Sequence, residues 1–284
     1  MPQELPRYET IIFDLDGTLF VGDNVIPGAP EAIAVLQEHF TCRFLSNNGE
    51  RTGASLATRL NAMGFEVAAE ELISSADLVV KFLEETQPGA RVLVRASDEL
   101  AQALKSSHFR IVEGGTADFV VIGVDRGLTR DKMVIALRSL LEGAQLVATN
   151  SDPTYPASDG QRPAAGAYVG IFRGMGYEPV RFCGKPDPRA VQSALRRWGI
   201  VDPSTCLFVG DNLRTDIAAA RAVGADSALV LTGVSGSTDA RADDLCPTYV
   251  VEDIGALPDE LAGARPGIQG CDEAMCCTNA RKEM

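Results

Sequence analysis

Two aspartates separated by one residue, Asp14 and Asp16, directly follow the short apolar segment Thr10–Phe13. At the end of a strand, two such carboxylates can divide the work of phosphoryl transfer. One attacks phosphorus, while the other protonates the leaving oxygen and later activates water. Gly17 permits the sharp turn that brings both side chains into the same space. The spacing is therefore compatible with nucleophilic and acid–base chemistry on a phosphate ester.

Polar groups also follow three other apolar segments of the chain. They are Ser46-Asn47-Asn48 after residues 42–45, Lys185 after residues 180–183, and Asp211-Asn212 with Asp216 after residues 206–209. Singly, each group is compatible with an ordinary turn or helix cap. Because the carboxyl ends of parallel strands share one edge of a sheet, where ligands bind, we expect all four segments to converge on one pocket.

Three of these side chains indicate a metal site. Asp14, Asp16 and Asp211 are hard oxygen donors, which Mg²⁺ binds while it keeps other positions for water and substrate phosphate. Without a cation, three carboxylates crowded into a partly buried site would strongly repel one another. We therefore predict that Mg²⁺ binds here and presents positive charge to a phosphoryl group.

The formal net charge of −13 argues against nucleic acid or an anionic membrane as a partner. For the same reason, a phosphate can bind only where local cations and hydrogen-bond donors reverse the overall field. Lys185 is the candidate cation, and Ser46, Asn47 and loop N–H groups near Gly17 are candidate donors. We expect a small phosphorylated metabolite as the partner.

Short apolar segments alternate with amphipathic helical segments along most of the chain. This alternation predicts an α/β fold, a Rossmann-like doubly wound parallel sheet with helices on its faces. The predicted strands are residues 10–13, 42–45, 91–95, 109–112, 119–124, 146–148, 180–183, 206–209, 228–231 and 249–251. The predicted helices are residues 30–40, 55–63, 97–106, 129–141, 188–198 and 215–223.

The second and third polar groups are separated by far more chain than one crossover between strands needs. The strand–helix pattern within this stretch predicts a second α/β domain inserted into the first. We predict a discontinuous core of residues 1–74 and 178–264, an inserted domain of residues 75–177, and a disordered tail of residues 265–284.

The apolar segments are too short to span a bilayer, and the N-terminus has no apolar core of a signal peptide. We therefore expect a cytoplasmic protein. The seven cysteines do not have the paired spacing of a disulfide framework. Cys42, Cys183 and Cys206 are expected to be buried, whereas Cys271, Cys276 and Cys277 fall in the predicted tail.

The segment Asp14-Leu15-Asp16-Gly17-Thr18-Leu19 resembles the nucleophile motif of the haloacid dehalogenase superfamily of phosphohydrolases. Ser46-Asn47-Asn48 resembles its second motif, Lys185 its third, and Gly210-Asp211 with Thr215-Asp216 its fourth, in the same order. Residues 26–29 and 148–156 resemble more narrowly the NagD-like branch, which includes 4-nitrophenylphosphatases and phosphatases for phosphoglycolate, glycerol phosphate and nucleotides. The resemblance covers about residues 8–255.

The resemblance implies a role for each matching residue. Asp14 is the nucleophile and a Mg²⁺ ligand, Asp16 is the general acid/base with its carbonyl on the metal, and Asp211 is a further ligand. The implied phosphate-binding residues are Ser46, Asn47, Asn48 and Lys185, and the implied supporting residues are Gly17, Thr18, Asn212 and Asp216. Gly49 is a departure, since relatives often have a small hydroxyl residue there. The inserted domain is expected to be a large C2-type cap that closes over the pocket, and its surface is compatible with a homodimer.

The sequence therefore predicts a phosphoric monoester hydrolase that is Mg²⁺-dependent and forms an aspartyl phosphate on Asp14. Its substrate would be phosphoglycolate, glycerol phosphate, a sugar phosphate or a nucleoside monophosphate, and the sequence does not choose among them. Two alternatives stay open. A phosphomutase or phosphotransferase would use Asp14 and Asp16 but exclude water, and an inactive regulatory protein would bind a phosphate ligand without cleaving it.

Overall fold

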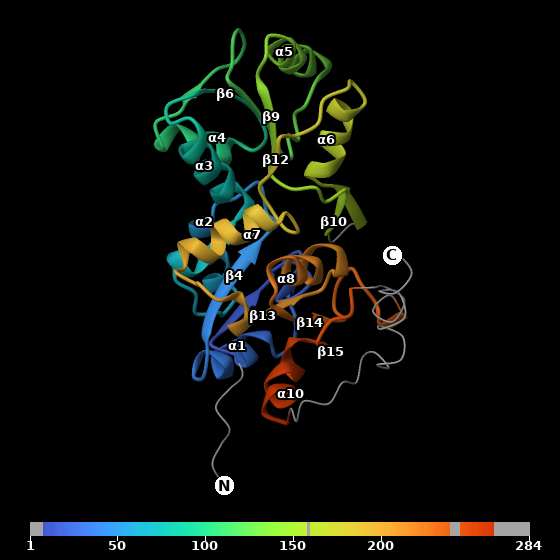
Figure 1. Ribbon diagram of the computed structural model, residues 1–284. Helices are drawn as coiled ribbons and strands as arrows, with labels where there is room; N and C mark the ends of the chain where they lie inside the picture. The colour runs from blue at the N-terminus through green and yellow to red at the C-terminus, as the bar shows by residue number, and fades with distance from the viewer. Residues whose placement is uncertain (1–7, 158–159, 239–244, 264–284) are drawn as a thin grey trace, which may run out of the picture. The chain divides into compact units, whose positions relative to one another are not determined.

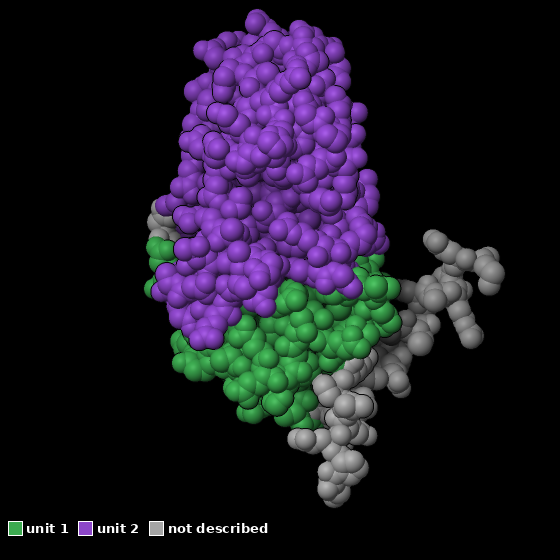
Figure 2. Space-filling model, turned by 90° about the vertical axis from the view of Figure 1, so that its left-hand side faces the viewer, with its two compact units in different colours: residues 1–44, 200–284 green, residues 45–199 purple. Residues whose placement is uncertain are grey.

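The computed structural model describes residues 8–157, 160–238 and 245–263 (Figure 1). The chain divides into two compact units, shown in green and purple in Figure 2. Unit 1 comprises residues 1–44 and 200–284, and unit 2 comprises residues 45–199. Unit 2 is thus one continuous stretch inserted into the chain of unit 1. The predicted α/β fold with an inserted α/β domain is confirmed, whereas the predicted boundaries at residues 75 and 177 stay a prediction.

Unit 1 is built on a parallel sheet with the strand order β15-β14-β13-β1-β4. The bounds are β1 Thr10–Phe13, β4 Thr41–Ser46, β13 Cys206–Gly210, β14 Asp226–Val230 and β15 Tyr249–Val251. All four residues of β1 are buried, because β13 and β4 flank it and both sheet faces are covered. β4 continues into unit 2, where β5 (Leu72–Ser74) is located. The middle of this sheet therefore delivers Asp14 and Asp211 to the same edge.

Among the described residues, the other elements with given bounds in unit 1 are a small hairpin and several short helices. They are β2 Phe20–Val21, β3 Asn24–Val25, α1 Ala29–Gln37, the 3₁₀ turns η2 Pro203–Thr205 and η4 Ile254–Ala256, the π-helical turn η3 Leu213–Ile217, α8 Ala218–Val223 and α10 Leu257–Gly263. The sequence predicted one helix over residues 215–223, but the structure has a π turn followed by a shorter α-helix. π turns occur frequently at functional sites, and this one contains Asp216.

Unit 2 has its own parallel sheet, with the strand order β12-β9-β8-β6-β7. The bounds are β6 Arg91–Arg95, β7 Arg110–Ile111, β8 Phe119–Ile122, β9 Gln145–Ala148 and β12 Arg181–Phe182. The helices and 3₁₀ turn are α2 Gly53–Ala62, η1 Ala69–Glu71, α3 Ser75–Thr86, α4 Asp98–Ser106, α5 Arg130–Leu141, α6 Ala165–Arg173 and α7 Pro188–Arg197. An antiparallel hairpin, β10 Thr154–Ala157 with β11 Gly160–Pro163, completes the unit.

Local sequence explains where several of these helices begin. Ser74 accepts a hydrogen bond from the backbone N–H of Asp77, and the Asp77 carboxylate accepts one from the Ser74 N–H, which forms a capping box for α3. Thr129 caps α5 in the same position, and Asp187 precedes Pro188 at the start of α7. Three helices of unit 2, α3, α5 and α7, therefore begin after a short polar residue.

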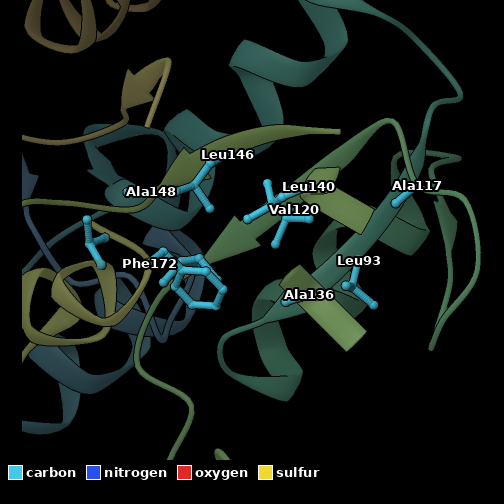
Figure 3. Packing of buried hydrophobic residues seen from close by; sticks show 10 residues of the cluster. Leu93, Ala117, Val120, Ala136, Leu140, Leu146, Ala148 and Phe172 are labelled. Carbon is cyan, nitrogen blue, oxygen red and sulfur yellow. The ribbon is translucent and has the colours of Figure 1, made fainter. Parts of the chain in front are cut away.

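The core of unit 2 lies where α5 and α6 cover the sheet (Figure 3). Val120 and Leu146 extend from neighbouring strands toward Leu140 of α5 and Phe172 of α6, and all four side chains are buried. Burial of side chains this large stabilises a fold by roughly 1.5–3 kcal/mol each. This core packs the inserted sheet against its helices, and the sheet in turn positions the residues at its carboxyl edge.

One strand lies in a different sheet from the one expected. The sequence predicted that residues 180–183 form part of the same sheet as β1, β4 and β13. Instead β12 pairs in parallel with β9, with Arg181 opposite Val147, at the edge of the unit 2 sheet. A segment this short has no pattern that specifies its partner, so only tertiary pairing decides its sheet. Lys185 therefore follows a strand of the inserted sheet.

Cys42, Cys183 and Cys206 are buried, as predicted, and Cys246 is exposed. Burial raises the pKa of the Cys206 thiol to about 11 and raises that of Cys183 as well, so both behave as small apolar side chains. Cys271, Cys276, Cys277 and the rest of the predicted tail lie outside the described residues. Among the helices that the structure describes, none has the length and apolar composition that crossing a membrane requires. The predicted cytoplasmic location stays a prediction.

Candidate active site

Asp14 and Asp16 lie on the turn that follows β1. The backbone N–H of Asp14 donates to the carbonyl of Val209 at 2.8 Å, which ties this turn to β13. Asp14 is 9% exposed and Asp16 is half-buried. Gly17 has φ +89°, a conformation that side chains with a Cβ rarely adopt, and an added Cβ would lie 2.6 Å from Cγ of Asp211. Glycine is required here for both reasons.

Asp211 and Asp216 are brought together by the end of β13 and the π turn that follows it. Asp211 is 3% exposed, and so is Asp216. The Asn212 N–H donates to Oδ2 of Asp216 at 3.1 Å, while Oδ1 of Asn212 accepts from the Arg214 N–H at 3.0 Å. A Cβ on Gly210 would collide with the Asp216 carboxylate. The local backbone thus folds around Asp216.

The loop after β14, residues 232–235, forms hydrogen bonds with Asp211 and with the turn that carries Asp14 and Asp16. The Val234 N–H donates to Oδ2 of Asp211 at 2.6 Å, and the Ser235 N–H donates to the Asp211 carbonyl at 3.0 Å. Oγ1 of Thr232 donates to the Gly17 carbonyl at 2.6 Å. Gly233 leaves room for this approach, since its added Cβ would lie 2.6 Å from Cβ of Asp211. No motif in the sequence had indicated that this loop is part of the site.

Asp14, Asp211 and Asp216, the acidic cluster, fit a divalent metal ion. Each offers one carboxylate oxygen, and these three oxygens lie within 4.8 Å of one another. All three side chains are buried, and carboxylate oxygens are the donors that Mg²⁺ and Ca²⁺ prefer. From the sequence, Asp216 was expected to support the site, and the structure places it among the candidate ligands. The Asp16 side chain is outside this cluster, and its predicted carbonyl contact with a metal stays a prediction.

The second predicted motif lies in unit 2, at the end of β4 and on the loop that follows. Ser46 is 2% exposed, and its Oγ accepts from the Asn48 N–H at 3.1 Å. Oδ1 of Asn48 accepts from the N–H groups of Glu50 and Arg51, at 3.0 and 2.9 Å. An added Cβ on Gly49 would lie 2.6 Å from Cβ of Thr149. The departure at Gly49 therefore has a steric reason, because this loop packs against the segment after β9.

Lys185 is buried at 3% exposure, and Asn47 binds its backbone. Oδ1 of Asn47 accepts from the Lys185 N–H at 2.7 Å, and Nδ2 of Asn47 donates to the Lys185 carbonyl at 2.9 Å. Nδ2 also donates to Oδ2 of Asp152 at 2.8 Å. The structure thus brings the second and third predicted motifs together within unit 2. Asp152 and Asn150 were missed as site residues, although the sequence singled out the segment that contains them.

The predicted site residues fall into two groups by unit. Unit 1 contains Asp14, Asp16, Gly17, Thr18, Asp211, Asn212 and Asp216, whereas unit 2 contains Ser46, Asn47, Asn48 and Lys185. Each group is assembled within its own unit by the contacts described above. The expectation that both groups share one pocket stays a prediction.

Comparisons with known proteins place the chain in a family. Residues 11–110 match the model of the haloacid dehalogenase-like hydrolases, and residues 182–257 match a second model of hydrolases of this type. The acid sugar phosphatase of Staphylococcus aureus is 32% identical over 259 residues, which cover 90% of this chain and 99% of the relative. That of Staphylococcus saprophyticus is 31% identical over the same length and coverage.

Solved structures agree with this relationship. The p-nitrophenyl phosphatase from Archaeoglobus fulgidus superposes with a TM-score of 0.84 at 31% identity, covering 89% of this chain and 99% of that one. The glycerol phosphate phosphatase from Mycobacterium tuberculosis in complex with magnesium gives a TM-score of 0.80 at 33% identity, covering 88% of this chain and 76% of that one. The same enzyme is also known in complex with calcium. Binding of a divalent metal ion is therefore supported, but these structures do not distinguish between Mg²⁺ and Ca²⁺.

These matches confirm three predictions made from the sequence: the superfamily, the NagD-like branch and the class of phosphoric monoester hydrolases. The two curated relatives are each matched over 99% of their length, so the resemblance extends beyond isolated motifs. This chain belongs to the haloacid dehalogenase-like hydrolases.

Proposed function

We propose that the protein is a Mg²⁺-dependent phosphatase that hydrolyses small phosphate monoesters through an aspartyl phosphate on Asp14. The observation that carries this proposal is the acidic cluster: three buried carboxylates, with oxygens within 4.8 Å, at the end of the strands that carry the predicted nucleophile. Phosphatase chemistry itself is supported by the relatives, all of which are named phosphatases in the comparisons above.

In the proposed first step, a carboxylate oxygen of Asp14 attacks phosphorus while the bond from phosphorus to the ester oxygen breaks. Asp16 gives its proton to that leaving oxygen, and the alcohol departs. Asp16 then takes a proton from water, whose oxygen attacks phosphorus. Inorganic phosphate leaves, and Asp14 is regenerated as a carboxylate. A bound divalent cation, held by Asp14, Asp211 and Asp216, would supply positive charge to the phosphoryl oxygens.

The phosphate oxygens require donors besides the cation. We assign this role to the Ser46 hydroxyl, the Lys185 ammonium and the backbone N–H groups of Asn47 and Gly49, in a phosphate-binding loop supported by Asn48. The rigid turns around Asn48 and Gly49 support this assignment, since preorganised donors cost little reorganisation during reaction.

For the substrate, we propose a small phosphorylated polyol or sugar. The names of the relatives support it, since they are acid sugar phosphatases and a glycerol phosphate phosphatase. Phosphoglycolate and nucleoside monophosphates belong in the same assay, because the sequence left them open. A homodimer also stays a prediction.

The test is phosphate release from these esters and from 4-nitrophenyl phosphate, with Mg²⁺ or with EDTA. Wild type should release phosphate only with the metal, and Asp14→Asn should lower kcat by about 10³-fold or more. Acid quench of wild type during turnover, followed by mass spectrometry, should find one phosphoryl group on the peptide that contains Asp14. Transfer to an added alcohol without release of inorganic phosphate would instead indicate a phosphotransferase. Phosphate binding without turnover of any ester would indicate a regulatory protein.

A further inference from the structure

The side-chain amide of Asn47 forms hydrogen bonds with the backbone of Lys185, much as the backbone of a neighbouring strand would. The amide pairs with both backbone groups of a single residue, accepting from the Lys185 N–H at 2.7 Å and donating to the Lys185 carbonyl at 2.9 Å. Such a two-point contact fixes both the position and the orientation of the backbone. Lys185 follows the short edge strand β12. The contact with Asn47 therefore holds the backbone in place after the hydrogen bonds of the strand have ended.

These contacts use both N–H groups of the Asn47 amide. A primary amide has two N–H donors, and here one reaches the Lys185 carbonyl while the other reaches Oδ2 of Asp152 at 2.8 Å. The Asp152 carboxylate also determines which way the amide faces, because only the NH₂ side can donate to it. In this arrangement the amide has no N–H to give to a phosphate oxygen.

The surroundings hold Asn47 in place. Nδ2 of Asn150 donates to the Asn47 carbonyl at 2.6 Å, and Oδ1 of Asn150 accepts from the Asp152 N–H at 3.0 Å. An added Cβ on Gly184 would lie 2.7 Å from Oδ1 of Asn47, so the chain before Lys185 passes close against this amide. Asn150 is 5% exposed. Asn47, Asn150 and Asp152, the amide clamp, thus form a continuous hydrogen-bonded support for the Lys185 backbone.

We propose that Asn47 is a positioning residue for Lys185, with its amide oriented by Asp152, and that this role replaces the side-chain phosphate contact expected for Asn47 from the sequence. The proposal rests on the proposed function in one respect, namely that the Lys185 ammonium neutralises the transferring phosphate. A buried lysine serves this purpose only if its stem starts from a fixed point, since a misplacement of about 1 Å can cost about 10²-fold in rate.

The chain contains a matched control for this contact. Asn61 pairs with Val67 in the same way, since Nδ2 donates to the Val67 carbonyl at 3.0 Å and Oδ1 accepts from the Val67 N–H at 2.9 Å. Both pairs lie in unit 2, and neither Asn61 nor Val67 is part of the proposed site. Replacing Asn61 by alanine therefore removes an equivalent pair of hydrogen bonds at a distance from the chemistry.

The first experiment compares Asn47→Ala, Asn61→Ala, Lys185→Ala and the double variant Asn47→Ala/Lys185→Ala. We measure kcat/KM for 4-nitrophenyl phosphate, the inhibition constant of inorganic phosphate and the melting temperature, all with Mg²⁺. Asn47→Ala should lower kcat/KM by about 10²-fold and weaken phosphate inhibition, while Asn61→Ala should keep both constants at wild-type values. The double variant should be no worse than Lys185→Ala, because Asn47 acts through Lys185.

A second pair of variants keeps the test decisive if Asn47→Ala does not fold. In Asn47→Asp, a carboxylate would face both the Lys185 carbonyl and Asp152, which should cost more than 10²-fold in kcat/KM. Adding Asp152→Asn exchanges the amide and the carboxylate between the two positions. The amide at position 152 can then donate to the carboxylate at position 47. We expect the exchange to recover at least tenfold over Asn47→Asp. If Asn47 were instead a phosphate ligand, the exchange should recover no more than the change in kcat/KM that Asp152→Asn alone causes in wild type.

The outcomes separate this inference from the proposed function. If Lys185→Ala has wild-type kcat/KM and phosphate inhibition, the proposed role of Lys185 fails. If Lys185→Ala is impaired but the effects of Asn47→Ala and Lys185→Ala multiply, or the exchange recovers nothing, Asn47 does not act through Lys185 and the inference is overturned. Wild-type kinetics in Asn47→Ala would overturn it directly.

Discussion

The acidic cluster of unit 1 and the amide clamp of unit 2 both hold charged side chains just beyond the end of a parallel strand, but they use different contacts. In unit 1, the Val234 N–H binds the Asp211 carboxylate itself, and glycines allow backbone to pack against it. In unit 2, the Asn47 side chain binds the backbone of Lys185, so the ammonium extends from a fixed main chain. Carboxylates that share a metal must converge within a few ångströms, whereas a lysine needs only a fixed origin for its long stem. The comparison therefore predicts that unit 1 is sensitive to added volume and unit 2 to lost hydrogen bonds.

The largest effect is expected from removing a member of the acidic cluster, and Asp16 tests whether that cluster is correctly defined. Asp216→Asn should abolish most of the rise in melting temperature that saturating Mg²⁺ gives wild type, which at 100 times the Kd corresponds to about 2.7 kcal/mol. Asp16→Asn should keep this rise and still lose activity, because its side chain lies outside the cluster. The measurement is a thermal melt with and without Mg²⁺. An unchanged Mg²⁺ response in Asp216→Asn would remove Asp216 from the ligands.

A smaller but still large effect should follow from one added methyl group in unit 1. Gly233→Ala directs a Cβ into Asp211, 2.6 Å from its Cβ, and should weaken Mg²⁺ binding by about 10–100-fold in calorimetric titration. Gly170→Ala is the control. Nothing lies within 4 Å of its added Cβ, and alanine should stabilise the helix by up to about 1 kcal/mol. Equal Mg²⁺ affinity in both variants would show that unit 1 tolerates added volume, against the comparison.

A moderate effect is expected when a single hydrogen bond to the nucleophile turn is lost. Thr232→Val removes the donor to the Gly17 carbonyl and should lower kcat about tenfold. It should also lower the free energy of unfolding by about 1 kcal/mol. Thr232→Ser keeps the hydroxyl and should restore kcat, which distinguishes the hydrogen bond from the volume of the side chain. Steady-state kinetics and denaturant unfolding give the two quantities. If valine and serine behave alike, the Thr232 hydroxyl does not position the turn.

The smallest effect concerns a partly exposed ion pair in unit 2, which contrasts with the buried charges above. Arg91 donates to both carboxylate oxygens of Asp118, at 2.8 and 3.2 Å, and this hydrogen bonding lowers the Asp118 pKa below its ordinary 3.8. Because the folded-state pKa is the lower one, the stabilisation is present above pH 3.8 and is lost as the pH falls through the folded-state pKa. Melting curves of wild type and Asp118→Asn should differ slightly at pH 7 and converge in acid. A difference that persists at the lowest pH would contradict this origin.

Much of the site could be predicted from the sequence because its chemistry depends on local order. Asp14, Asp16 and Gly17 lie within one turn, and the apolar segment before them has the composition of a buried central strand. The same holds for Asp211 after β13. Residue type and position relative to a strand end were sufficient to predict a phosphoric monoester hydrolase, and the relatives confirm that class.

Contacts between distant segments could not be predicted in the same way. The two-residue strand β12 pairs with β9 because of the packing within unit 2. A segment that short has no hydrophobic pattern that specifies its partner strand. The hydrogen bonds between Asn47 and Lys185 join residues 138 positions apart, and the one between Thr232 and Gly17 joins residues 215 positions apart. Side-chain chemistry and the position of a residue at the end of a strand are properties of the local sequence. Which amide is used for support and which carboxylate joins the cluster depend on packing, so only the tertiary structure decided them.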